Sequence, residues 1–166
     1  MRLKATIAGL ILLTSSEAVQ AQHKLAYMAN IDGTCSSLVV ADVDQSPKCP
    51  TWLLNTAYED NYSSFRLITD DGLVISFFGY DNEAKGDVAH LSVERVLMTS
   101  APKAESGQSD ADLFSQAKSN TLDLKAEGDC EYTNPSLPDS HVNCEAKVDG
   151  KIYSFKFHVT GFKVLR

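Results

Sequence analysis

The sequence predicts a mainly β protein, either an antiparallel β-sandwich or a small barrel, with one short helix. Three observations lead to this prediction. Apolar and polar residues alternate with a period of two along much of the chain, turn residues separate these runs, and four cysteines form two equally spaced pairs. The paired spacing also allows the domain to consist of two related half-units packed together.

The composition fits a single packed domain. The chain has 166 residues, of which 43% are hydrophobic and 22% are charged, and its formal net charge is -7. This content of apolar residues is typical of a globular protein and not of a disordered or collagen-like chain. The negative charge argues against nucleic acid as a partner, because phosphate binding needs clustered lysine and arginine.

Residues 1–21 are predicted to be a cleaved signal peptide. Two basic residues precede an apolar run at 5–13, which is too short to span a bilayer. Val19 and Ala21 are the small residues expected three and one positions before the cleavage site. We therefore expect a periplasmic or secreted protein that consists of residues 22–166 as one disulfide-stabilised β domain, with no membrane span after cleavage.

The four cysteines are expected to form two disulfides, because export leads to an oxidising compartment. Thirteen residues separate Cys35 from Cys49, and thirteen also separate Cys130 from Cys144. A glycine lies two positions before the first cysteine of each pair. From this repeated spacing we infer the bridges Cys35–Cys49 and Cys130–Cys144, each contributing roughly 3 kcal/mol by constraining the unfolded chain.

The segments that follow the two cysteine pairs resemble each other. Residues 64–67 and 154–157 share the order serine, phenylalanine, basic residue, apolar residue. We interpret the cysteine spacing and this similarity as two copies of one unit, each closing its own disulfide loop. Chance similarity between short strand-like segments is the alternative.

Turn residues divide the chain into the predicted strands. Turns are expected at residues 59–61, 69–72 and 149–150, and Asp149-Gly150 is typical of a two-residue hairpin because both positions need a positive φ. The final strand alternates most regularly, with three aromatic residues on the face that we expect to be buried. The expected strands cover residues 38–43, 51–58, 63–68, 73–78, 88–98, 121–126, 144–148 and 151–159.

The middle of the chain lacks this pattern. Residues 99–110 are predicted to form a flexible linker, because they contain proline, glycine and several serines but no large apolar residue. The short helix is expected to begin at Ser109 or Asp110 and to end at Lys118, since either residue can cap a helix and apolar residues follow at helical spacing.

No local motif points to catalysis, a metal ion or a cofactor. The four histidines are scattered, the acidic clusters lack calcium-loop spacing, and two disulfides leave no cysteine free. A hydrolase could still assemble from distant residues, with His90 or His141 beside Asp87 or Asp139. We therefore expect a binding protein and keep an envelope hydrolase as the weaker alternative.

The candidate partner-binding residues are Glu127, Asp129 and Glu131. Alternation along a strand would place all three side chains on one face, beside Cys130. A concentrated negative patch favours a cationic partner such as a basic protein of the cell envelope, whereas most charge runs are only solvated surface. The leading hypothesis is thus an inhibitor or immunity-type protein.

The candidate ligand-binding residues are Trp52, Tyr58, Tyr62 and Phe65. An aromatic groove between sheets would suit a small ligand or a glycan, which is the alternative function. For Trp52, packing in the core beside a disulfide is the competing interpretation. The sequence gives no indication of the oligomeric state.

Overall fold

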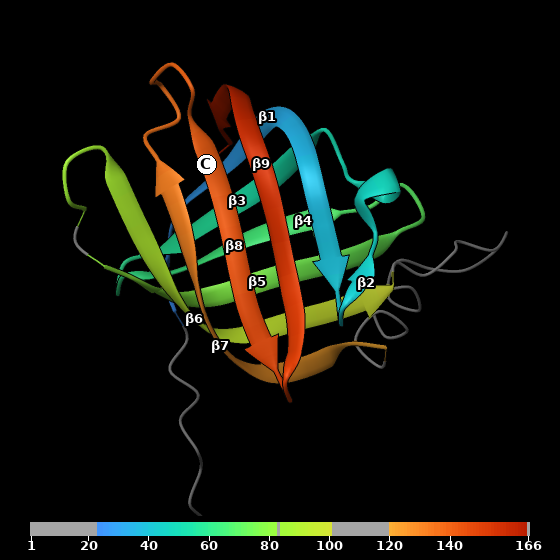
Figure 1. The fold of residues 1–166 in the computed structure, drawn as a ribbon. Helices are drawn as coiled ribbons and strands as arrows, with labels where there is room; N and C mark the ends of the chain where they lie inside the picture. The colour runs from blue at the N-terminus through green and yellow to red at the C-terminus, as the bar shows by residue number, and fades with distance from the viewer. Residues whose placement is uncertain (1–22, 83, 101–119, 166) are drawn as a thin grey trace, which may run out of the picture.

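The computed structural model describes residues 23–82, 84–100 and 120–165, which form a closed antiparallel barrel of eight strands with one short extra strand (Figure 1). The order around the barrel is β1-β3-β4-β5-β6-β7-β8-β9, and β1 also pairs with β9 to close it. The described strands are β1 (Leu25–Val40), β2 (Val43–Asp44), β3 (Trp52–Tyr58), β4 (Tyr62–Ile68), β5 (Leu73–Asp81), β6 (Val88–Ser100), β7 (Leu122–Thr133), β8 (His141–Val148) and β9 (Lys151–Val164), and the 3-10 helix η1 (Ser46–Lys48) precedes β3.

Closure decides between the two predicted architectures. Because β1 pairs with β3 along one edge and with β9 along the other, a single sheet closes on itself, and the predicted small barrel is confirmed in place of a sandwich. The short strand β2 folds back on the end of β1. Closure leaves the eight barrel strands without a free sheet edge over most of their length.

The predicted turns join consecutive strands. Residues 59–61, 69–72 and 149–150 connect β3 to β4, β4 to β5 and β8 to β9. Asp149 and Gly150 have φ values of 49° and 80°, as a two-residue hairpin requires. These turns depend on the residues within them, which is why the sequence predicts them correctly.

The first strand differs from its prediction. It begins at Leu25, whereas the sequence predicts a strand only over residues 38–43. Its pairing with β9 shifts register between Asp32 and Gly33 and again between Cys35 and Ser37. Each shift changes the face on which later side chains lie, so the alternation that marks a strand is interrupted along β1.

The ends of two other strands also differ from their predictions. β7 continues to Thr133, beyond the predicted end at residue 126, and β6 runs to Ser100, so the first two residues of the expected linker belong to a strand. The rest of that linker lies outside the described residues. The expected helix and the predicted signal peptide lie outside them as well. No helix in the described part of the chain is long and apolar enough to cross a membrane.

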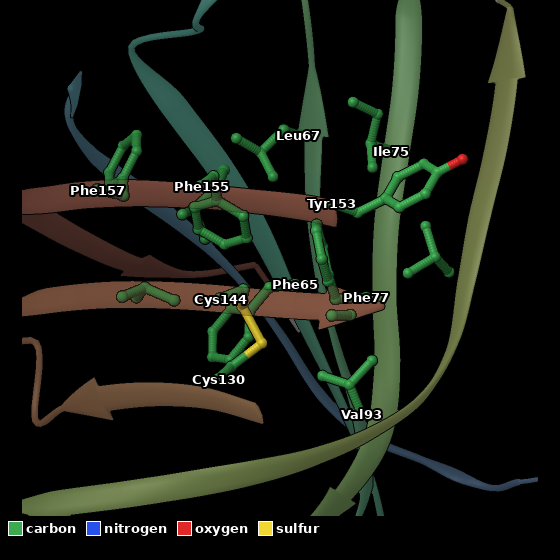
Figure 2. Packing of buried hydrophobic residues seen from close by; sticks show 14 of the residues in the cluster. Phe65, Leu67, Ile75, Phe77, Val93, Cys130, Cys144, Tyr153, Phe155 and Phe157 are labelled. Carbon is green, nitrogen blue, oxygen red and sulfur yellow. A yellow bond between two sulfur atoms is a disulfide. The ribbon is translucent and has the colours of Figure 1, made fainter. Parts of the chain in front are cut away.

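The inward faces of the strands form one hydrophobic core. Tyr153, Phe155, Phe157 and Val159 of β9 are all buried, as the alternation predicts. Phe155 packs edge-on against Phe77, with their ring centroids 5.3 Å apart. Figure 2 shows these rings in the same cluster as the disulfide between β7 and β8. Each fully buried phenylalanine contributes about 1.5–3 kcal/mol.

Neighbouring strands pass very close at Gly79, where a Cβ atom would lie 1.8 Å from the carbonyl oxygen of Ser92, and at two glycines near the cysteines. A Cβ atom at Gly33 would lie 2.0 Å from the carbonyl oxygen of His158, and one at Gly128 would lie 2.1 Å from the carbonyl oxygen of Glu145. Only a residue without a side chain fits such an approach. Gly33 and Gly128 are the glycines that precede Cys35 and Cys130 by two positions, so each has a structural reason.

Both predicted disulfides are present. Cys130 and Cys144 are paired directly across β7 and β8 and lie inside the core, whereas Cys35 on β1 joins Cys49, which follows η1, in a half-buried position. Two disulfides favour an extracellular or otherwise oxidising compartment.

Candidate functional site

A groove with charged walls lies along β7, β8 and β9. Its volume is about 950 Å³, which is within the range of ligand-binding clefts. β7 curves around the β8–β9 hairpin (Figure 1). Gly128 of β7 lies close to the backbone of Glu145 and Ala146 in β8. Most of the lining side chains are charged or polar and point away from the core.

The three acidic residues predicted to bind a partner line this groove together. Glu127, Asp129 and Glu131 are exposed, while Cys130 between them is buried in the barrel. Alternation along β7 therefore places the three carboxylates on one outer face, as expected.

The centre of the groove holds two carboxylates on adjacent strands. Asp129 of β7 is paired directly with Glu145 of β8. Side chains of such pairs lie on the same face and within about 4.5–5.5 Å at their Cβ atoms, so the two negative charges repel each other. Among the described residues, no ion pair involves Glu145, whereas Asp129 is hydrogen-bonded to Nδ1 of His90 at 2.7 Å.

Histidines border the acidic residues on both sides. Besides the pair of His90 and Asp129, Nε2 of His141 lies 3.1 Å from Oε1 of Glu131. The carboxylate partners of both histidines thus differ from Asp87 and Asp139, the partners considered for a hydrolase. No group of three or more His, Cys, Asp or Glu side chains within the described residues is arranged to hold a metal ion.

Lysines give the groove a mixed charge pattern. Lys147 is paired with Glu127 across β8 and β7, and Lys156 is paired with Asn143 across β9 and β8. Acidic residues nevertheless outnumber lysines along the lining. The acidic residues of the lining are Glu127, Asp129, Glu131, Glu145 and Asp149, and its lysines are Lys125, Lys147 and Lys156.

Sequence reasoning names His90 of β6 and His141 of β8 only as hydrolase candidates, and it misses the other residues that β8 and β9 add to this site. Glu145 is the most important of them, and its role depends on its pairing with Asp129. The alternation of residues 141–148 indicates which side chains point outward, but the strand register determines what each one faces.

The predicted aromatic ligand site is divided between two surfaces. Phe65 points into the core and contacts Tyr132 edge-on, with ring centroids 5.1 Å apart. Tyr62 lies on the other face of β4, where its ring stacks on His23 at 4.2 Å and contacts Tyr58 at 6.1 Å. The expectation that these residues line one groove is therefore wrong, because Tyr62 and Phe65 are three positions apart on one strand and point in opposite directions.

Trp52 is the remaining member of the predicted aromatic site. It is half-buried at the start of β3, where it is paired with Asp32 of β1. The next residue, Leu53, is fully buried in the core, so Trp52 lies on the outer face of the barrel. It therefore lies on the opposite face from Phe65.

Tyr62 is buried although it faces outward. Burial raises the pKa of its phenol to about 12, with a further contribution from the negative charge of Glu94 and an opposing one from Arg95. The phenol therefore stays protonated at neutral pH. Its ring contacts make Tyr62 part of the packing on this outer face.

No family model, curated protein or solved structure matches this chain. Geometry and charge are therefore the basis of the functional proposal.

Proposed function

We propose that this protein is an exported, non-enzymatic binding protein whose groove along β7, β8 and β9 docks a cationic partner. A basic protein of the cell envelope is the partner that fits, which would make the chain an inhibitor or immunity-type protein. The observation that carries this proposal is the direct pairing of Asp129 with Glu145 at the centre of the groove.

The paired carboxylates favour a cation for an energetic reason. Like charges directly opposite each other on neighbouring strands destabilise the fold by about 0.2–1 kcal/mol. A lysine or arginine side chain placed between Asp129 and Glu145 would be attracted to both and would remove their repulsion. A charged groove of this kind would also accelerate association with a basic protein.

The Cys130–Cys144 disulfide supports the same site from inside the barrel. Asp129 precedes Cys130 and Glu145 follows Cys144, so the bridge joins the two strands directly beneath the acidic pair. This covalent link prevents the strands from slipping and keeps the carboxylates opposite each other. A preorganised binding surface loses less conformational entropy when the partner docks.

Export is part of the proposal. The predicted signal peptide at residues 1–21 and the two disulfides both support a periplasmic or secreted protein, where a basic envelope protein would be encountered.

A capture experiment tests the proposal. The protein, purified after export, is immobilised and exposed to envelope extract and culture fluid at low and moderate salt, and each retained protein is then measured for affinity. We expect a basic protein whose binding falls at least tenfold in the variant carrying Asp129→Asn and Glu145→Gln. The variant carrying Asp70→Asn and Asp87→Asn loses the same charge outside the groove and should bind like the wild type.

Two results would overturn the proposal. One is the absence of a retained basic protein at either salt concentration. The other is equal binding by the groove variant and the wild type, because affinity would then not depend on the acidic pair.

The alternative function, a small-ligand-binding β domain, is favoured by a different observation. At one end of the barrel a carboxylate and two phenols point inward, away from the groove on the outer face. This site shares no residue with the groove and does not depend on the docking proposal.

A further inference from the structure

One end of the barrel contains a cluster of inward-facing polar side chains. Tyr27 of β1, Ser63 of β4, Asp81 of β5 and Tyr132 of β7 belong to it. The strand pairing establishes their direction, because directly paired residues lie on the same face of a sheet. The residues paired with Tyr27, Asp81 and Tyr132 are Ala57, Leu91 and Val142, all of which are buried.

The carboxylate of Asp81 is the centre of this cluster. The hydroxyl of Tyr132 donates a hydrogen bond to its Oδ1 atom at 2.8 Å, and the hydroxyl of Ser63 also favours the ionised carboxylate and lowers its pKa. Burial still raises the pKa of Asp81 above its ordinary value, because the hydroxyl bonds offset only part of the desolvation. The four side chains come from four different strands, so the barrel as a whole positions them.

The two phenols respond to the same charge. Burial raises the pKa of both Tyr27 and Tyr132, and the negative charge of Asp81 raises each of them further. Both phenols are therefore neutral at physiological pH. Among the described residues, no ion pair involves Asp81, so the partners of this half-buried carboxylate are neutral hydroxyls. Buried charges are normally paired with a charge of opposite sign.

Apolar side chains at the same end of the barrel remain exposed. Phe162 and Val164 near the end of β9 are paired with the buried residues Ile31 and Ala29, which places them on the inner face. The pairing of β8 with β9 starts at His158, so beyond that residue β9 is paired only with β1. Phe162 and Val164 are consequently 41% and 54% exposed, and Tyr27 is 40% exposed.

We propose that this end of the barrel binds a small amphipathic organic cation, an amine that carries a hydrocarbon group. The ammonium group would lie at Asp81, next to the rings of Tyr27 and Tyr132, and the hydrocarbon group would contact Phe162 and Val164. This site is separate from the acidic groove and takes a small molecule in place of a protein.

The chemistry of the cluster distinguishes between ligand classes. An ammonium group gains the attraction of the carboxylate and the favourable interaction of a cation with an aromatic face. A carboxylate ligand would be repelled by Asp81. A neutral alcohol or sugar could form hydrogen bonds here, but it would leave the negative charge without a partner. The site therefore prefers amines to alcohols and to acids of the same chain length.

Three probes of equal chain length test this preference on the wild-type protein. Octylammonium, 1-octanol and octanoate are titrated separately into isotope-labelled protein, and amide chemical shifts are recorded by NMR. We expect octylammonium to bind at least tenfold more tightly than 1-octanol, with the largest shifts at β1, β5, β7 and the end of β9. Octanoate should bind most weakly. Equal affinity for octylammonium and 1-octanol would refute the role of Asp81, and the absence of octylammonium binding would refute the site.

Variants then separate this site from the acidic groove. Asp81→Asn should weaken octylammonium binding at least tenfold and bring it to the level of 1-octanol, because the amide keeps the shape but lacks the charge. Asp129→Asn, which removes one charge from the groove, should leave the affinity unchanged. The opposite pattern would assign the amine to the groove and overturn the proposal. Failure of the groove experiment alone would not affect this result, because the two sites share no residue.

Discussion

The two disulfides close loops of equal length in different surroundings. Each joins cysteines 14 positions apart, yet Cys130 and Cys144 are 0% and 3% exposed in the core, whereas Cys35 and Cys49 are half-buried beside the core. Loop length determines how much a bridge restricts the unfolded chain, so this contribution is the same for both. The difference between them therefore lies in packing, which cysteine spacing does not reveal.

Cys35 and Cys49 of the first bridge pack against the hydrophobic core, but polar and charged residues lie next to them in the chain. Lys48, which precedes Cys49, forms an ion pair with Asp71 in the turn between β4 and β5 at 2.8 Å. The second bridge instead lies beneath the acidic pair of the groove. The first bridge thus attaches a surface loop to the barrel, and the second joins two strands of the core.

Removal of each bridge should reveal the largest difference in stability between the two regions. Replacing Cys35 and Cys49 with alanine should lower the free energy of unfolding by about 3 kcal/mol, because the unfolded chain gains the conformational freedom that the bridge had removed. Replacing Cys130 and Cys144 should lower it by about 5 kcal/mol, because the core also loses two packed sulfur atoms. Urea unfolding followed by circular dichroism measures both values. Equal losses would show that packing around the second bridge contributes nothing.

Alanine substitutions at the glycines before the two bridges should have similar effects on stability, although the bridges differ in burial. Gly33→Ala and Gly128→Ala should each destabilise the protein by about 2–4 kcal/mol, because the new Cβ would overlap a carbonyl oxygen of the next strand. Gly161→Ala is the control, since its Cβ would lie 3.5 Å from Asp32 and should change stability by less than about 1 kcal/mol. Thermal unfolding measures all three. A tolerated alanine at only one of the first two positions would show that the two units differ in backbone geometry. Their origin by duplication stays a prediction.

The pKa values of two carboxylates should be shifted in opposite directions. Hydrogen bonds from Lys48 and Thr69 lower the pKa of Asp71 to about 2, whereas burial raises that of Asp81. The ionised form of Asp71 therefore contributes stability above its ordinary pKa near 4, and this contribution is lost as the pH falls towards 2. The contribution of Asp81 is fully present below pH 4 and is lost as the pH rises through its raised pKa.

Carboxyl chemical shifts measured by NMR give both pKa values directly. Asp81→Asn should in addition remove the loss of stability that accompanies ionisation of Asp81, so its free energy of unfolding relative to the wild type should increase above pH 4. A pKa of Asp81 below that of Asp71 would contradict the burial of the barrel-end cluster.

The smallest effect is expected in the acidic groove. Glu145→Gln should raise the free energy of unfolding by about 0.2–1 kcal/mol, because it removes the repulsion from Asp129. The gain should decrease at high salt, which screens exposed charges. Asp70→Asn, outside the groove, serves as the control and should have no comparable effect. A lower stability of Glu145→Gln would show that Glu145 stabilises the folded protein and that repulsion from Asp129 does not destabilise it.

Features are predicted correctly from the sequence when the residues that produce them lie close together in the chain. The Asp149-Gly150 turn and the buried face of the final strand follow from residues close together in the chain, and both are confirmed. The start of β1 at Leu25 is missed because register shifts interrupt its alternation. Asp81 is missed for another reason. It continues the inward positions of Phe77 and Gly79, so its place inside the barrel is consistent with the pattern, but its partners lie on β4 and β7.

The sequence by itself determined the strands with regular alternation, the tight turns, the two disulfide pairs and the outward direction of Glu127, Asp129 and Glu131. These features depend on local periodicity and on spacing along the chain. Only the tertiary structure decided that the sheet closes into a barrel, that Asp129 faces Glu145 and that Tyr27, Asp81 and Tyr132 meet at one end. The physical reason is that register and closure arise from pairing between residues far apart in the chain, where a shift of one position would exchange the inner and outer faces.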